Sequence, residues 1–221
     1  MSNKVNLVKV EKKVKPKGED YIATMYRLEE TFGESRLSYI ASELGVTLAT
    51  ASRVLDRLAR DGYVLKTRRG TLRLTSLGKS VARDIIRRHR VIEVFLIEVF
   101  GLDLASAHNM AHELEHVESF AKLADEYLNF PSFCPHGNPI PSRGETRGQR
   151  LSTVSSGRYV VTRVTELKKP LAYVKDLDIR PNRVIEVLNR EENAVIVKMN
   201  GLIHELPLEI CEFIFVEKVV S

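Results

Sequence analysis

The 221-residue sequence predicts a mainly α-helical protein with a small β part at its C-terminal end. Apolar residues recur at helical spacing through much of the stretch from residue 19 to residue 128. From residue 157 to residue 221 the pattern changes to short alternating runs, which are typical of strands. Residues 63–75 alternate on both sides of Arg69-Gly70, which predicts a β-hairpin directly after a pair of helices. These observations predict an N-terminal winged helix-turn-helix, a helical dimerisation domain and a C-terminal SH3-like β-barrel.

Composition indicates a globular protein, and the charge bears on its partner. Hydrophobic residues make up 43% of the chain, and no stretch approaches the roughly 20 apolar residues of a membrane span. The basic N-terminus is not followed by the apolar core of a signal peptide, so we expect a cytoplasmic protein without a membrane partner. The net charge of +5 favours an anionic partner. Cys134 and Cys211 lie far apart and form no CxxC, so no disulfide framework is expected.

The N-terminal helices have the spacing of a helix-turn-helix. Apolar periodicity predicts a helix over 19–32 and a short one over 37–44, which Gly45 closes. Thr47 is a natural N-cap for a third helix. The residues predicted on the buried face of this third helix are Leu48, Ala51, Val54, Leu55 and Leu58.

The third helix and the hairpin carry residues suited to a DNA duplex. Arg binds guanine bidentately in a major groove, hydroxyl side chains reach phosphates or base edges, and a basic hairpin can follow the phosphates. We therefore expect double-stranded DNA with a palindromic operator as the partner of a homodimer. The residues predicted to contact DNA are Ser38, Thr47, Ala49, Thr50, Ser52, Arg53, Arg60, Arg68 and Arg69.

The middle of the chain predicts one long helix over 76–100, basic in its first half and apolar in its second. A helix that is apolar nearly all round is buried in a core or in a partner, so we assign the second half to dimerisation. Gly101 breaks this helix, and a His-rich helix and a further helix over 121–128 follow. The strands expected after residue 157 are Tyr159–Val164, Arg183–Leu188, Val195–Met199, Leu202–Leu206 and Phe213–Val219.

The His-rich helix carries the clearest candidate for chemistry. His108, His112, Glu115 and His116 are three or four residues apart, so they are expected to share one helix face. Imidazoles and a carboxylate on one stripe are typical of a divalent-metal site. The domains expected on these grounds are a winged helix at 1–78, with a basic arm at 1–18, a helical dimerisation and metal-binding domain at 79–141, a linker at 142–152 and an SH3-like domain at 153–221.

This order of parts resembles the diphtheria-toxin-repressor family of metal-dependent transcription repressors, and its manganese-sensing branch is equally similar. The motifs that carry the resemblance are Glu19-Asp20-Tyr21-Ile22, Arg60-Asp61-Gly62, Leu74-Thr75-x-x-Gly78, Arg88-His89-Arg90-x-x-Glu93, Glu115-His116 and Gly137-Asn138-Pro139-Ile140-Pro141. The resemblance implies a repressor of metal-homeostasis genes with Fe(II) or Mn(II) as the cofactor. Zn(II), Co(II) or Ni(II) should also bind in vitro, because affinity follows the general divalent series.

The resemblance also implies two metal sites. The positions that match the primary site, between the first helix and the dimerisation domain, are Asp20, His112, Glu115 and His116. The positions that match the ancillary site are His89, Glu93 and His108. The toxin repressor has Met and Cys at the positions of Asp20 and His112, and the manganese branch has Glu at the position of Ala23 and no His at that of His108. The chain therefore combines features of both branches.

Iron-type members add two ligands from the barrel to the ancillary site. The matching positions here fall near Leu167 and Pro170, whose side chains cannot bind a metal. Glu166 is adjacent and would reach the site only after a shift in register.

Two other functions remain open on the sequence alone. His112-Glu113-x-x-His116 is the H-E-x-x-H pattern of zinc hydrolases, in which Glu acts as general base, but no second ligand motif follows it. The His cluster of a winged-helix regulator can also hold a purely structural metal or form a polar network. We favour a non-enzymatic repressor without a small-molecule substrate. One ion joining Asp20 to the dimerisation domain would hold two recognition helices at the separation of successive major grooves, roughly 34 Å.

Overall fold

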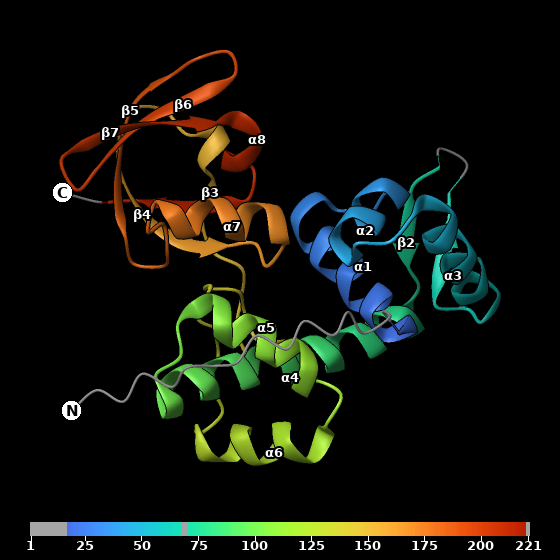
Figure 1. The fold of residues 1–221 in the computed structure, drawn as a ribbon. Coiled ribbons are helices and arrows are strands. Elements are labelled where there is room, and N and C mark those ends of the chain that lie inside the picture. The colour runs from blue at the N-terminus through green and yellow to red at the C-terminus, as the bar shows by residue number, and fades with distance from the viewer. Residues whose placement is uncertain (1–16, 68–69, 220–221) are drawn as a thin grey trace.

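The computed structural model describes residues 17–67 and 70–219 (Figure 1). Arg68 and Arg69, two of the predicted DNA contacts, and most of the predicted basic arm lie outside these residues. Figure 1 shows the N-terminal helices with their hairpin, the helices α4–α6, and the C-terminal sheet as three neighbouring parts. The predicted mainly α fold with a small β part is therefore confirmed.

The N-terminal part has the predicted helix-turn-helix and hairpin. Its elements are α1 (Gly18–Phe32), α2 (Leu37–Leu44), α3 (Leu48–Arg60), β1 (Val64–Lys66) and β2 (Leu72–Leu74). Gly45 ends α2 in the left-handed region with φ 64°, and Thr47 Oγ1 accepts a hydrogen bond from the Thr50 N–H at 3.1 Å, which caps α3. The prediction that Leu48 belongs to the core was wrong, because it is 55% exposed. As the first residue of α3, it projects beyond the core that Ala51 and the later turns contact.

The middle part is built on α4 (Ser76–Phe100), which runs without a break from its Thr75 cap to Gly101, as predicted. The helices α5 (Leu104–Leu114) and α6 (Glu118–Tyr127) pack along it. None of the helices in the described ranges is long and apolar enough to cross a membrane. Because α5 ends at Leu114, Glu115 is its C-cap and His116 lies in the turn before α6.

The C-terminal part is one antiparallel sheet in the order β3-β8-β4-β5-β6-β7. Its strands are β3 (Gln149–Arg150), β4 (Gly157–Val164), β5 (Val184–Arg190), β6 (Ala194–Met199), β7 (Leu202–Pro207) and β8 (Ile214–Lys218). The strands predicted after residue 157 are confirmed. The sequence did not predict β3, the 3-10 helix η1 (Leu151–Thr153), or the helices α7 (Lys168–Asp176) and α8 (Leu208–Cys211).

The C-terminal part packs directly against the N-terminal helices. Phe213, in the turn before β8, and Leu167 belong to the same buried cluster as Met25 of α1. The Phe213 ring meets the Phe32 ring edge-on, with 5.4 Å between their centroids. The backbone N–H of Lys168 donates to Glu43 Oε1 of α2 at 2.9 Å. These contacts place the segment around residues 165–168 beside α1 and α2, the helices that precede α3.

Candidate metal centre

Within the described residues, three groups of metal-ligand side chains gather where α1, α4, α5 and the segment after α6 meet. In each group, one ligand atom per residue lies within 4.8 Å of the others. We call these sets the outer, middle and inner groups, and every member of the inner group is buried. The outer group is Asp20, Glu115 and His116, the middle group is His89, His108 and His112, and the inner group is Glu93, Cys134, His136 and Glu166.

The outer group joins α1 to the end of α5. His116 Nε2 lies 3.4 Å from Asp20 Oδ1, and His116 Nδ1 lies 2.8 Å from Glu19 Oε2. The other carboxylate oxygen of Asp20 accepts a hydrogen bond from the Lys17 N–H, which caps α1. Burial raises the pKa of Asp20 above its ordinary value, although the Lys17 hydrogen bond and the charge of His116 oppose this. A divalent cation in this group would favour the carboxylate form.

The middle group consists of imidazoles that face one another across the contact of α4 with α5. His89 Nε2 lies 3.2 Å from His108 Nδ1, and His108 Nε2 lies 3.2 Å from His112 Nε2. Burial lowers the pKa of His112 to about 3. Burial also disfavours the charged form of His89, but the charge of Glu93 and hydrogen bonds with Glu115 and Glu93 outweigh it, and its pKa rises to about 9. Imidazole nitrogens this close suit a shared cation, which would displace the proton that His89 carries.

The inner group is buried between α4, the segment after α6 and the segment that joins β4 to α7. Glu93 Oε2 lies 3.3 Å from His136 Nδ1, and the Cys134 thiol donates to Glu166 Oε1 at 2.8 Å. Burial, with the neighbouring charge of Glu166, raises the pKa of Cys134, so the thiol keeps its proton without a metal. Burial would raise the pKa of Glu166 too, but Arg90 outweighs it and lowers that pKa to about 2.

The donor sets fit divalent metals of different softness. Two carboxylates and an imidazole in the outer group suit Mn(II) or Fe(II), whereas imidazoles suit most first-row ions. The thiol, imidazole and carboxylates of the inner group suit Zn(II), which is bound by Cys, His and acidic side chains in tetrahedral sites. The residues present therefore fit a metal in every group.

The predicted primary ligands are only partly brought together. Asp20, Glu115 and His116 form the outer group, but His112 lies in the middle group, with its Nδ1 3.6 Å from Glu115 Oε2. The expectation that the four His and Glu residues share one helix face does not hold for His116, which turns toward α1 after the end of α5.

The predicted ancillary ligands lie in mutual contact. Glu93 Oε1 is 3.1 Å from His89 Nε2 and 2.5 Å from His108 Nδ1. The Glu93 carboxylate therefore faces the middle group with one oxygen and the inner group with the other. Glu93 is therefore a member of the inner group that also contacts the middle group.

Cys134 and His136 were not among the ligands predicted from the sequence, and Glu166 was a candidate only after a shift in register. The available signal was the Cys134-x-His136 spacing, which puts a sulfur and a nitrogen ligand two residues apart in an irregular, Pro-rich segment. The burial of Glu166 against Arg90 of α4 and Arg27 of α1 could not be predicted from the sequence, because it depends on where the C-terminal part docks.

The His112-Glu113-x-x-His116 residues do not form a zinc-hydrolase site in the described structure. His112 and His116 fall into different groups in the described part of the chain, with His112 turned to His108 and His116 turned to Glu19. Glu113, the expected general base, is exposed to solvent.

The predicted DNA contacts within the described residues lie on α2, on α3 and at the N-cap of α3. Exposed side chains are Ser38, Thr47, Ala49, Thr50, Arg53 and Arg60. Ser52 is half-buried and donates to Asp56 Oδ2 at 3.4 Å, and the other oxygen of Asp56 binds Lys66 of β1. This ion pair ties the hairpin to α3.

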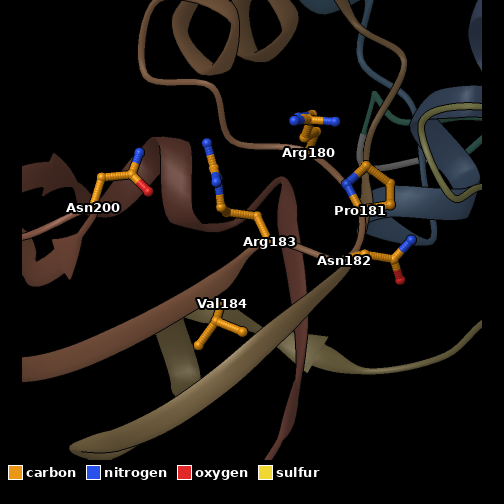
Figure 2. Close-up of a pocket in the computed structure, with 6 residues that line it drawn as sticks. All are labelled: Arg180, Pro181, Asn182, Arg183, Val184 and Asn200. Atoms are coloured by element: carbon orange, nitrogen blue, oxygen red, sulfur yellow. The ribbon is translucent and has the colours of Figure 1, made fainter.

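A separate hollow of about 450 Å³ lies on the C-terminal sheet (Figure 2). Its lining residues are Arg180, Pro181, Asn182, Arg183, Val184 and Asn200. Both arginines already bind the Asp178 carboxylate. Since none of the lining residues belongs to the three ligand groups, the hollow is not part of the metal centre.

Known proteins and solved structures are similar to this chain over nearly its whole length. A family model described as "Iron dependent repressor, N-terminal DNA binding domain" matches residues 13–72, and one described as "Iron dependent repressor, metal binding and dimerisation domain" matches residues 75–142. The chain is 31% identical to the iron-dependent repressor IdeR of Mycobacterium leprae, over 91% of this chain and 96% of that protein. It is 29% identical to the diphtheria toxin repressor of Corynebacterium efficiens, over 91% and 95% of the two chains. The solved structure of the manganese regulator SloR is similar with a TM-score of 0.82 at 27% identity, over 93% of this chain and 100% of that one.

Proposed function

This chain belongs to the iron-dependent repressor family, and we propose that it is a transcriptional repressor whose DNA binding is switched on by Fe(II) or Mn(II). Relatives named for iron and for manganese support both metals. The observation that carries the proposal is the 3.4 Å approach of Asp20 Oδ1, in the DNA-reading part, to His116 Nε2, in the helical part.

The outer group connects the N-terminal part to the helical part of the chain. When bound, a divalent ion supplies the positive charge that offsets the two carboxylates there. Asp20 belongs to α1, which packs with α2 and α3, whereas Glu115 and His116 directly follow α5. Holding Asp20 at this place therefore holds α3 relative to α4, and so relative to the second subunit. A ligand that binds only this arrangement shifts the population toward it.

We assign the ligands as two sites. The primary site uses Asp20, Glu115 and His116, with His112 as the fourth ligand from beside Glu115. The ancillary site uses His89, Glu93 and His108. The proximity of the inner group supports adding Cys134, His136 and Glu166 to this second site.

The dimer is proposed to form through the apolar end of α4. Val99 and Phe100 there are 39% and 63% exposed, although the rest of that half of the helix is largely buried. A two-fold dimer would present two α3 helices about 34 Å apart to a palindromic operator. The protein would then act in the cytoplasm as a regulator and not as an enzyme. We propose the same domain limits for it as the sequence predicts.

The test is the Asp20→Asn variant. Asn removes the charged ligand but keeps an oxygen that can cap α1. We expect metal-stimulated DNA affinity to fall by at least about tenfold, while thermal unfolding of the metal-free protein stays unchanged. The matched control is Asp84→Asn, which changes an exposed carboxylate on α4. Full metal stimulation in Asp20→Asn would refute the proposed function.

A further inference from the structure

We propose that Glu19 is a positioning residue of the outer group, which fixes the His116 ring so that Nε2 faces the metal. This inference rests on the proposed function, because it concerns how the same site is prepared. Glu19 is not itself among the three members of the outer group.

The two ring nitrogens of His116 face two consecutive carboxylates of α1. Nδ1 lies 2.8 Å from Glu19 Oε2, whereas Nε2 lies 3.4 Å from Asp20 Oδ1. The first distance is that of a hydrogen bond, and the second is long for one. A neutral imidazole has one N–H and one lone pair, so a proton held on Nδ1 by Glu19 leaves the Nε2 lone pair directed at Asp20.

This arrangement matches a general requirement of metal-bound histidine. Such a residue binds metal through one nitrogen and donates the other N–H to a carboxylate or carbonyl, which fixes the tautomer and raises ligand basicity. His116 needs this support because it lies in the turn after α5, outside the helix. Glu19 supplies it from α1, the same helix that supplies Asp20, so both carboxylates meet the ring only when α1 is docked.

A purely stabilising role for Glu19 is a weak alternative. The side chains of Glu19 and His116 are 49% and 21% exposed, and exposed ion pairs contribute little to stability. Glu19 also lies in the first turn of α1, where any carboxylate is favoured by the helix dipole. Glu118 occupies the equivalent first turn of α6 and is exposed, so it is a matched control for that effect.

The experiment compares Glu19→Gln, Glu19→Ala and Glu118→Gln in the full-length protein. The first readout is Mn(II) affinity by calorimetry. The second is the tautomer of His116, followed by ¹⁵N NMR of the metal-free protein at a pH where the ring is neutral. We expect both Glu19 variants to bind Mn(II) about 10- to 100-fold more weakly, and Glu118→Gln to bind as the unaltered protein does. We also expect the Nδ1 proton to be fixed in the unaltered protein and to redistribute to Nε2 in Glu19→Ala.

Three outcomes would overturn the inference: equal Mn(II) affinity in all variants, a weaker affinity in Glu118→Gln as well, or an unchanged His116 tautomer in Glu19→Ala. A failure of the proposed function is distinguishable, because Asp20→Asn would then keep metal-stimulated DNA binding. The tautomer measurement needs no metal, so it tests the role of Glu19 whether or not the proposed function is correct.

Discussion

His89 Nδ1 lies 2.7 Å from Glu115 Oε2, and this contact joins the middle group to the outer group. Both side chains are almost fully buried. The opposite ring nitrogen, Nε2, faces Glu93 at 3.1 Å. Glu115 therefore has two roles, because it belongs to the outer group and also orients a ring of the middle group.

This double role predicts that His89→Ala affects both metal sites. The variant removes a ligand of the ancillary site and also frees Glu115 from the partner that orients it. We expect the outer group to bind Mn(II) about tenfold or more weakly. His108→Ala removes a ligand of the same site. His108 contacts His112, but among the described residues it has no hydrogen bond to Glu115. The affinity of the outer group should therefore fall less than in His89→Ala. Mn(II) titrations followed by electron paramagnetic resonance would measure both, and equal effects of the two variants would contradict the assigned linkage.

Metal binding should depend on pH through His89. Its pKa is raised to about 9, so in the metal-free protein the ring carries a proton that a metal ion must displace. For this one proton, affinity should fall about tenfold for each pH unit below 9. Calorimetry in buffers of different ionisation enthalpy would count the released protons. Binding without proton release near neutral pH would contradict this prediction.

The raised pKa of His89 also predicts how the stability of the metal-free protein changes with pH. A folded-state pKa raised from 6.5 to about 9 stabilises the fold below pH 6.5, and this contribution is lost as the pH rises through 9. Urea unfolding of the metal-free protein at increasing pH would therefore show falling stability across this window.

Local patterns were enough to predict most of the fold. Thr47 begins α3 and Gly101 ends α4 through interactions with neighbouring residues, which a sequence pattern can reveal. The alternation after residue 157 identifies strands independently of their order in the sheet. The helix α7 was missed because Pro170 lies within it, near its start, where the absent N–H costs little but helical spacing is hard to recognise.

The site was less predictable because it is assembled from three parts of the chain. The spacing of the His residues indicated a metal site, but it did not reveal that His116 turns to α1 while His112 turns to α4. Arg90 illustrates the same limit. It belongs to a basic stretch in the sequence, yet it is 1% exposed, because Glu30 and Glu166 converge on it from distant elements.

Cys134 should give a spectroscopic signature of the inner group. With Co(II) bound, a thiolate ligand produces a charge-transfer band in the near ultraviolet, because the metal displaces the thiol proton. We expect the band in the unaltered protein and its loss in Cys134→Ser. Cys211→Ser is the matched control, since Cys211 is buried in the core of the C-terminal sheet and lies outside all three groups. A band that persists in Cys134→Ser would remove this residue from the metal site.

Arg90 should be the side chain on which the docking of the three parts most depends. It lies on α4, donates through Nε to Glu166 Oε2 at 3.1 Å, and donates through Nη2 to Glu30 Oε2 of α1 at 2.6 Å. Arg90→Met leaves the buried Glu166 carboxylate without its main counter-charge, which typically costs about 3–5 kcal/mol in unfolding free energy. Arg83→Met changes an exposed arginine on the same helix and should cost no more than about 0.5 kcal/mol.

The double variant Arg90→Met/Glu166→Gln separates charge from packing. If the loss comes from an unpaired buried carboxylate, replacing Glu166 by a neutral amide should recover much of the stability, because the interaction is not additive between contacting residues. If the loss comes from the packing of the arginine stem, the double variant should be no more stable than Arg90→Met. Urea unfolding of the four metal-free proteins (unaltered, both single variants and the double) gives the coupling energy. A value near zero would mean that this ion pair does not hold the C-terminal part against α4.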